Sequence, residues 1–271
     1  MRLALIRKTL RDTRIPLIAA AAAIAAFEYL FVFAVDTHRD ELHTYLNIIP
    51  PFAKRMMRLM AGADIFSHLT PTGLMSIGLA HPFLLAVLSV FSFAYCSRVL
   101  AGEIDAGTAD LLLTLPLRRS GVYVSLTAVW AVAGLCLCTA PLLGVWIAQR
   151  FWQRGPFEMD RLAMVCVNLF ALYVSVGATS LMFSAMMSRR WRTIALLVTL
   201  MLTAFVVNFL SAIWPPAERI AFLSVLHYYQ PLPTIAEDRW PLHDLSILAL
   251  TALLAWLIGL VVFTRRDIRT A

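Results

Sequence analysis

Residues 97–121 read SRVLAGEIDAGTADLLLTLPLRRSG and form a polar interruption between two long apolar runs. Three acidic residues, Glu103, Asp105 and Asp110, lie here between arginines at both ends of the stretch. Each flanking run is long enough to cross a bilayer as a helix, which takes about 20 apolar residues. The stretch therefore decides the fold, because it is the short connection between two membrane spans.

The composition is that of a membrane protein. Of 271 residues, 61% are hydrophobic and 14% charged, against roughly 45–50% and 25% in soluble domains. The runs that approach or exceed the length of a span are residues 15–35, 74–96, 122–148, 162–187, 193–214 and 245–263. They are continuously apolar, whereas the strands of a membrane barrel alternate. We expect an all-α integral membrane protein with six transmembrane helices, forming a single domain over residues 1–271.

Lysine and arginine side chains indicate the orientation in the membrane. The net charge is +7, but the basic residues are spread over the ends of loops, so the positive-inside rule explains them better than a nucleic-acid partner does. The short segments that share a side with both termini hold Arg2, Arg7, Lys8, Arg11, Arg14, Arg98, Arg118, Arg119, Arg189, Arg190, Arg192, Arg265, Arg266 and Arg269. Both termini are therefore expected in the cytoplasm, with the loops 36–73 and 215–243 outside.

Residues 1–14 have the pattern of a helix that lies in the membrane interface. Leu3, Ile6 and Leu10 recur at helical spacing, and Arg7 and Arg11 lie on an adjacent face. We expect an in-plane amphipathic helix that leads into the first span. The arginines would also serve as positive-inside anchors, and the two interpretations are compatible.

Two polar side chains in the apolar runs are candidates for a translocation path. An ionised Glu28 costs a few kcal/mol in lipid and should face protein or water, although it lies near the outer end of its run, where it could also snorkel. His81 precedes Pro82, which should kink the second span. No metal site can be built around His81. All four cysteines fall within or at the edge of spans and indicate packing rather than disulfides or zinc.

The connections outside the core carry further expectations. Residues 50–60 begin with two prolines and have the spacing of a short amphipathic helix on the outer side. Residues 217–229 have helical apolar spacing and could dip back into the outer leaflet. The turn 188–192 is so short that the fourth and fifth spans must be antiparallel neighbours.

No ATP-binding motif occurs in the chain. Residues 102–108 imitate the phosphate loop G-x-x-x-x-G-K-[ST], but threonine follows the second glycine where lysine is required. The only lysines, Lys8 and Lys54, are not preceded by glycine. The common hydrolase signatures are also missing. We therefore expect no enzymatic activity in this chain, and no cofactor or metal of its own.

The polar stretch itself has the features of a docking element. The second span should leave the membrane and break near Gly102, after which Asp105 or Thr108 can cap a short helix. Leucines at 111–113 and 115 give that helix an apolar side, and Pro116 ends it. The sequence predicts a short amphipathic coupling helix between spans 2 and 3, exposed to the cytoplasm.

The same residues resemble the signature of the type-2 permease subunits of ATP-binding-cassette (ABC) transporters. The shared pattern is A-G-E-x-x-x-G-T-x-x-x-L-L-x-x-P-x-x-R, carried here by Ala101, Gly102, Glu103, Gly107, Thr108, Leu112, Leu113, Pro116 and Arg119. The likeness extends to the amphipathic N-terminus, the six-span layout and the closing residues Arg265, Arg266 and Asp267.

The resemblance implies a permease of an exporter in the bacterial cytoplasmic membrane. A separate ATPase subunit would bind ATP and Mg and dock on residues 97–121. A second permease copy or homologue would complete the transporter, with a substrate path lined by the first, second and fifth spans. The residues expected to couple the chain to its ATPase are Glu103, Asp105, Gly107, Thr108, Leu112, Pro116 and Arg119.

Two other classes of function remain open. The first is an ATP-independent membrane protein, either a proton-coupled carrier or an assembly factor that uses Glu28; a carrier often shows an internal repeat, and none is evident. The second is an intramembrane enzyme, which would require Glu28, His81 and Ser180 to converge in a wet cavity.

Overall fold

The computed structural model describes residues 2–37, 50, 51, 54, 70–107, 118–152, 157–211 and 214–266. All regular structure in these residues is helical, and they contain no strand. Six of the helices are long and apolar enough to cross a membrane, as predicted. The chain is a multi-pass membrane protein.

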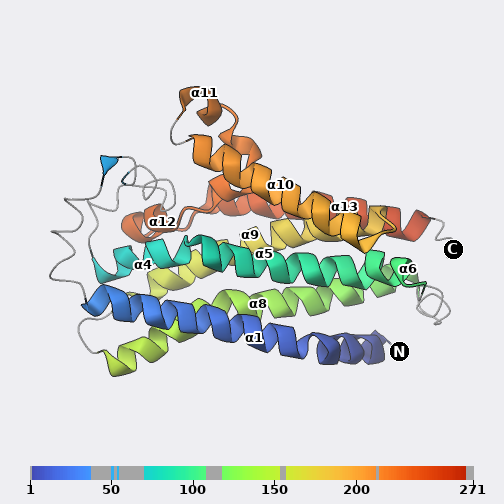
Figure 1. Ribbon diagram of the computed structural model, residues 1–271, viewed down its shortest axis with the longest axis horizontal. Helices are drawn as coiled ribbons and strands as arrows, with labels where there is room; N and C mark the ends of the chain where they lie inside the picture. Colours follow the sequence, from blue (N-terminus) through green and yellow to red (C-terminus); the bar gives the residue numbers. More distant parts are fainter. Residues whose placement is uncertain are drawn as a thin grey trace.

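The six long helices form an elongated bundle (Figure 1). In chain order they are α1 (Arg2–Thr37), α5 (Pro82–Ser97), whose span continues in helical form to Asp105, α8 (Arg119–Phe151), α9 (Met159–Met186), α10 (Arg190–Ser211) and α13 (Leu242–Arg265). The first and last described residues lie at the same end of the bundle, which we call the termini end, and we call the other the opposite end. Short helical pieces connect the spans at both ends of the bundle.

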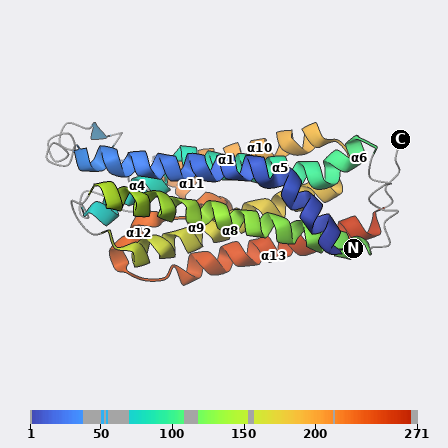
Figure 2. The ribbon, with the colours of Figure 1, turned by 90° about the horizontal axis from the view of Figure 1, so that it is seen from below.

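Helix α1 joins two segments that were predicted separately. The sequence suggested an in-plane helix over residues 1–14 followed by a span, whereas the structure has one continuous helix from Arg2 to Thr37. Pro16 lies inside this helix, and Figure 2 shows the N-terminal part bent away from the rest. A proline removes one backbone hydrogen bond and bends a helix without necessarily ending it.

The second span starts later than predicted. The apolar run 74–96 is divided between α4 (Pro71–Leu79) and α5, which begins at Pro82. The His81 side chain caps α5, since its Nδ1 atom accepts a hydrogen bond of 3.2 Å from the Phe83 amide. Pro82 therefore stands at the first position of a new helix, where its missing N–H costs nothing, instead of kinking a continuous one.

Helix α9 packs in the centre of the bundle against α5, α8 and α13. The rings of Trp130 on α8 and Tyr173 on α9 are stacked with centroids 4.9 Å apart. A Cβ atom at Gly177 would lie 1.8 Å from Trp130 Cζ2, so only glycine leaves room for the indole there. The small residues that the sequence places on α9 thus allow the close helix approach typical of membrane bundles.

Helix α10 departs from the bundle. Its only buried side chains are Thr193 and Leu197, near the termini end. From there it leans away toward the opposite end (Figure 1), although it follows α9 after a turn of only residues 187–189. The fifth span is therefore connected to the fourth as predicted but packs against it only near the turn.

The segment after α10 returns toward the bundle as a series of short pieces. They are α11 (Pro215–Glu218), η3 (Ala221–Leu223), η4 (Val225–Tyr228) and α12 (Pro231–Glu237). The helical spacing over residues 217–229 is thus divided among three short helical pieces, α11, η3 and η4. Ser224 Oγ donates a 2.9 Å hydrogen bond to the Ala204 carbonyl, seven residues before the last residue of α10, or about 10 Å along its axis. The segment therefore reaches back along α10 to the depth of Ala204.

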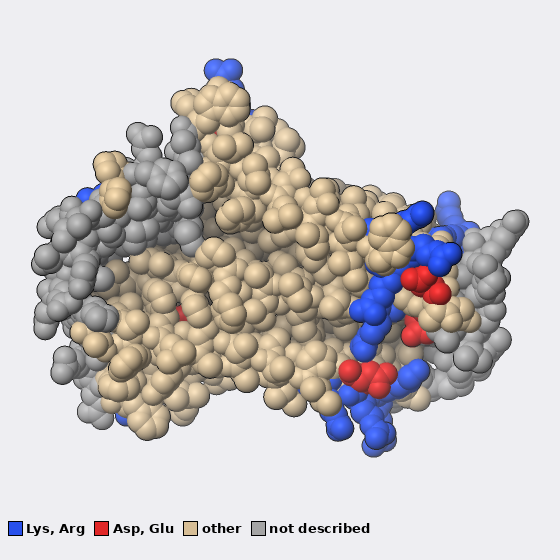
Figure 3. All heavy atoms as spheres, in the orientation of Figure 1, with Lys and Arg blue, Asp and Glu red and all other residues tan. Residues whose placement is uncertain are grey.

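Charged side chains gather at the termini end on the face shown in Figure 3, and the middle of that face is largely uncharged. The exposed basic residues at this end include Arg7, Lys8, Arg11, Arg14, Arg118, Arg189, Arg190, Arg192 and Arg265. This distribution is what a bilayer around the middle of the bundle requires, because ionised side chains are costly in the hydrocarbon region.

Candidate functional site

The connection between α5 and α8 begins with an irregular helical segment. After α5 the chain forms the π-helix η2 (Arg98–Gly102) and then the single turn α6 (Glu103–Asp105). The Ser184 hydroxyl of α9 accepts a 3.1 Å hydrogen bond from the Ala101 amide and donates a 2.7 Å bond to the Cys96 carbonyl. A π-helix departs from the regular α-helical hydrogen-bond pattern, and Ser184 bonds two backbone groups at this point.

Asp105 connects this segment to the turn between α9 and α10. Its Oδ1 atom lies 3.1 Å from Arg189 Nη1, and its Oδ2 atom accepts a 3.2 Å hydrogen bond from the Arg190 amide. From the sequence, either Asp105 or Thr108 was expected to cap a helix in this loop, and that helix lies outside the described residues. In the structure both carboxylate oxygens contact the start of α10, 84 and 85 residues further along the chain.

Arg119 and Arg266 connect the other end of the loop to the same turn. Arg119, the first residue of α8, donates a 2.6 Å hydrogen bond to the Arg266 carbonyl. The Arg266 guanidinium in turn donates to the carbonyls of Ala185 and Met187 at 2.9 and 3.1 Å and contacts the Ser188 hydroxyl. These carbonyls belong to the last turn of α9, where a cation is favourable.

The seven predicted coupling residues are therefore only partly described. Glu103 and Asp105 lie on α6, and Arg119 begins α8. Gly107 follows α6 with a φ of +68°, a left-handed conformation that glycine adopts without strain. Thr108, Leu112 and Pro116, with the predicted coupling helix, lie outside the described residues. The two flanks of that segment are both held by the α9–α10 turn, a relationship that the sequence did not indicate.

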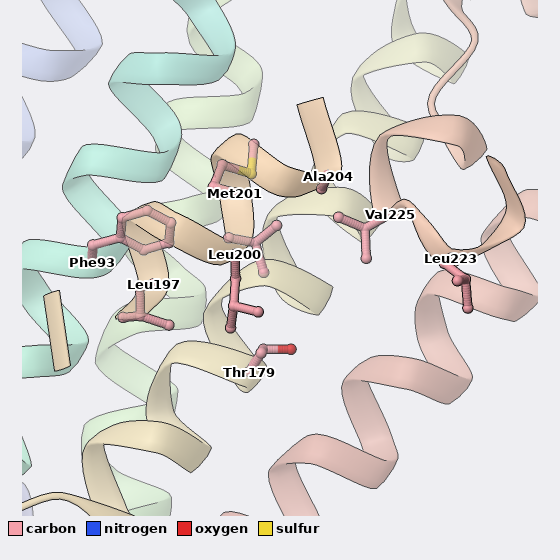
Figure 4. A pocket seen from close by; sticks show the side chains of 9 residues that line it. Phe93, Thr179, Leu197, Leu200, Met201, Ala204, Leu223 and Val225 are labelled. Carbon is pink, nitrogen blue, oxygen red and sulfur yellow. The ribbon is translucent and has the colours of Figure 1, made fainter. Parts of the chain in front are cut away.

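A pocket of about 240 Å³ lies between α5, α9, α10 and the η3–η4 segment. In Figure 4, Phe93 of α5 lies at one end of the pocket, and Leu223 and Val225 of the η3–η4 segment lie at the other. The α10 side chains Leu197, Leu200 and Met201 line the wall between them. Ala204 and Val176 complete the apolar lining, and Thr179 contributes a hydroxyl. The pocket exists because α10 leans away from α9, so it could not be found from the sequence.

The η3–η4 segment is held over this pocket from both sides. Ser224 bonds α10 at Ala204, as described above, and Tyr229 donates a 3.0 Å hydrogen bond to the Leu79 carbonyl of α4. Tyr229 lies outside the six spans, and burial raises the pKa of its phenol well above the usual value. The hydroxyl therefore keeps its proton and remains a donor. Further along, Arg161 of α9 donates a 3.0 Å bond to the Ile235 carbonyl of α12.

The two candidate path residues lie in the same region, where α1 meets the α4–α5 junction. Glu28 is fully buried, and neither carboxylate oxygen has a hydrogen-bond partner within the described ranges. A Cβ atom at Gly78 would lie 2.8 Å from Glu28 Oε2, and one at Gly144 would lie 3.0 Å from Glu28 Cβ, so two glycines make room for this side chain. The neighbouring ring of Phe27 lies 5.0 Å from that of His81.

Asn168 of α9 is a second buried polar side chain of this kind. Its exposed fraction is 1%, and neither its oxygen nor its nitrogen is hydrogen-bonded to any described residue. Asn168 was not among the predicted site residues, although a polar amide in the middle of an apolar run indicates a candidate functional position. The third residue of the enzyme alternative, Ser180, donates a 2.8 Å hydrogen bond within its own helix to the Val176 carbonyl.

No group of three or more His, Cys, Asp or Glu side chains in the described part of the chain could hold a metal ion. Comparisons with protein-family models, with curated proteins and with solved structures found no match to this chain. The function is therefore inferred from the residues and their geometry.

Proposed function

We propose that this protein is the permease subunit of a type-2 ABC exporter and is driven by a separate ATPase subunit that docks on residues 97–121. The observation that carries the proposal is the attachment of that loop. Asp105 and Arg119, which lie within this loop on either side of residues 108–117, both connect to the α9–α10 turn, directly or through Arg266. A displacement of α6 or of the start of α8 would therefore be transmitted to the α9–α10 turn through these bonds.

The motifs and charges of the sequence independently support the same function. A chain with a docking loop and no phosphate loop needs an ATPase in trans. The basic residues at the termini end support a cytoplasmic position for the loop by the positive-inside rule, on the side where ATP is available. The transporter would lie in the bacterial cytoplasmic membrane, with ATP and Mg bound only by the partner.

The exposed surface of α10 supports a second permease copy as a partner. Apolar side chains along this helix remain exposed in the single chain: Val198, Leu200, Leu202, Phe205, Val206 and Leu210. A second copy packed on this face would enclose the open side of the pocket between α5 and α10. The pocket would then form part of an apolar substrate path between the two permeases, in agreement with a path lined by the second and fifth spans.

The test is co-expression of this chain with a stand-alone ATPase encoded by a neighbouring gene. We expect the two proteins to copurify and the complex to hydrolyse ATP, whereas the purified permease alone should not. Replacing Glu103 or Pro116 with alanine should leave membrane insertion intact and lower ATPase coupling. Full coupling in both variants would show that the loop is not the docking element.

A second candidate function is a proton-coupled carrier that uses Glu28. It is favoured by one observation, the complete burial of an acidic side chain without a hydrogen-bond partner in the described part of the chain. Such a group is costly to keep in the membrane and is a functional candidate for that reason. A pH gradient across proteoliposomes, without ATPase or ATP, would drive transport by a carrier and would have no effect on an ABC permease.

A further inference from the structure

The side chain of Asp105 is directed back to the bundle, toward the start of α10. Asp105 is the last residue of α6, and its two oxygens engage one side chain and one backbone amide of the α9–α10 turn, Arg189 Nη1 at 3.1 Å and Arg190 N at 3.2 Å. The side chain is 26% exposed, against 64% for Arg189. The Asp105 carboxylate is thus engaged by the start of α10, and little of it is accessible to a docked partner.

Helix α10 depends on this contact for capping. The first amides of a helix have no partner within the helix, and a side-chain oxygen normally supplies one from the residue just before it. That place is occupied by Arg189, which has no acceptor in its side chain, and the preceding Ser188 hydroxyl contacts Arg266. Asp105 provides the acceptor from a distant part of the chain, and its negative charge is favourable at a helix N-terminus.

The backbone packs closely enough to make this a firm connection. A Cβ atom at Gly102 would lie 3.5 Å from Arg190 Cδ, so the π-helix lies beside the residue whose amide donates to Asp105. On its other side the π-helix is bonded to Ser184 of α9. A displacement of α6 must therefore move the start of α10 or break these bonds.

The pocket lies between the two points at which hydrogen bonds hold α10. Arg190 is held by Asp105 at the termini end, and Ala204, 14 residues or about 21 Å further along the helix, is held by Ser224. Leu197, Leu200 and Met201 line the pocket between these points. A sideways shift of the first turn with Ala204 as pivot would therefore change the width of the pocket.

We propose that Asp105 is the positioning residue through which the loop moves α10, so that a displacement of the loop widens or narrows the pocket between α5, α9 and α10. This inference rests on the proposed function, because it requires an ATPase that displaces the loop. In this role Asp105 transmits the displacement of the loop to α10 within the permease, and it does not need to contact the ATPase.

The experiment uses the permease–ATPase complex with a bimane fluorophore on Leu200→Cys in the pocket wall. Cys136→Ser removes the one described cysteine that is exposed. ATP should change the bimane emission in the parent complex. At equal amounts of bound ATPase, Asp105→Ala should reduce the ATP-dependent emission change at least about fivefold, the lower limit of typical coupling between sites. Asp160→Ala removes an exposed acid at the start of α9 and should have no effect.

Two further variants separate transmission from folding. Asp105→Asn keeps an oxygen for the Arg190 amide but loses the charge, and Arg189→Gln breaks the ion pair while leaving the cap; both should fold and show intermediate emission changes. An unchanged emission response in Asp105→Ala would overturn the inference while the proposed function stands. A parent permease that binds no ATPase would instead refute the proposed function, and the inference would fall with it.

Discussion

Ser184 on α9 holds the backbone of the α5–α6 junction open by pairing with the amide of Ala101 at 3.1 Å and, through its own proton, with the Cys96 carbonyl at 2.7 Å. The π-helix η2 lies between the membrane part of the second span and the loop. π-helices of one turn are often found at functional positions because they change the direction of the side chains that follow. Here the residue that follows is Glu103, the start of α6.

The first prediction concerns the hydroxyl of Ser184. Ser184→Ala leaves a buried amide and a buried carbonyl without this partner, and we expect it to lower the free energy of unfolding by about 1–3 kcal/mol. Ser180→Ala is the matched control, because Ser180 is also fully buried on α9 but bonds only within its own helix. Thermal unfolding in detergent should show a loss for Ser184→Ala and little change for Ser180→Ala. Equal losses would mean that the junction does not depend on Ser184.

The second prediction concerns the close approach of α8 and α9 at Gly177. Gly177→Ala places a methyl group where Trp130 lies, and overpacking of this kind costs about 1–3 kcal/mol. Trp130→Phe removes the part of the ring that would clash, although it also loses the 3.2 Å hydrogen bond from the indole to Ser92. In a double-mutant cycle the combined variant should therefore be more stable than the sum of the single losses predicts. Strict additivity would show that the two residues are not in contact.

The number of spans could be predicted from the sequence because a membrane helix needs a continuous apolar run, and each run is visible by itself. The boundaries were less accurate. The third span was predicted over residues 122–148 and the helix covers Arg119–Phe151, since helices continue into the polar flanks outside the hydrocarbon. The second span was predicted from residue 74, because the apolar run hides the break at Ala80 and His81.

The candidate site was predictable only in part, because its contacts join residues that are far apart in the sequence. The signature around Glu103 is local, so the loop could be located from its residues. The acceptor for the Arg190 amide is 85 positions away, and no spacing rule relates the two. The pocket likewise depends on the tilt of α10, which follows from contacts at its two ends and leaves no periodic pattern in the chain.

The third prediction concerns the partner of α10. Leu202 is 58% exposed on this helix. If a second copy packs there, Leu202→Cys in a Cys136→Ser background should form a disulfide-linked dimer in membranes under mild oxidation. Leu253→Cys on α13 is the control, because Leu253 is 53% exposed on another helix. Cross-linking of both positions to the same extent would indicate random collision, and none at Leu202 would exclude a homodimer through this part of α10.

The fourth prediction concerns the pocket of about 240 Å³. Ala204→Met should fill part of it and raise the free energy of unfolding by about 0.5–2 kcal/mol, as cavity-filling substitutions commonly do. Ala195→Met is the control, since Ala195 is exposed on the same helix and does not line the pocket. If the pocket is part of the substrate path, the stabilised Ala204→Met protein should nevertheless lose export in cells. A destabilised Ala204→Met protein would mean that α10 packs more tightly against α9 than the structure has it.

The fifth prediction separates a structural role of Glu28 from a functional one. A buried carboxyl group without a hydrogen-bond partner gives no stability to the fold, so Glu28→Met should raise the free energy of unfolding by about 1–3 kcal/mol. Glu28→Gln keeps polar atoms in the same space and should bring no such gain. Both variants can be measured by thermal unfolding at one pH and tested for transport in the same preparation.

The comparison of stability with transport then decides between the two candidate functions. A carrier that uses Glu28 to bind protons would lose transport in both variants, because neither side chain can exchange a proton. A permease that is driven through its loop would keep ATP-dependent transport in Glu28→Gln, provided that the space between Gly78 and Gly144 is still filled. A stability loss in Glu28→Met would contradict the expectation that this buried carboxyl group gives no stability to the fold.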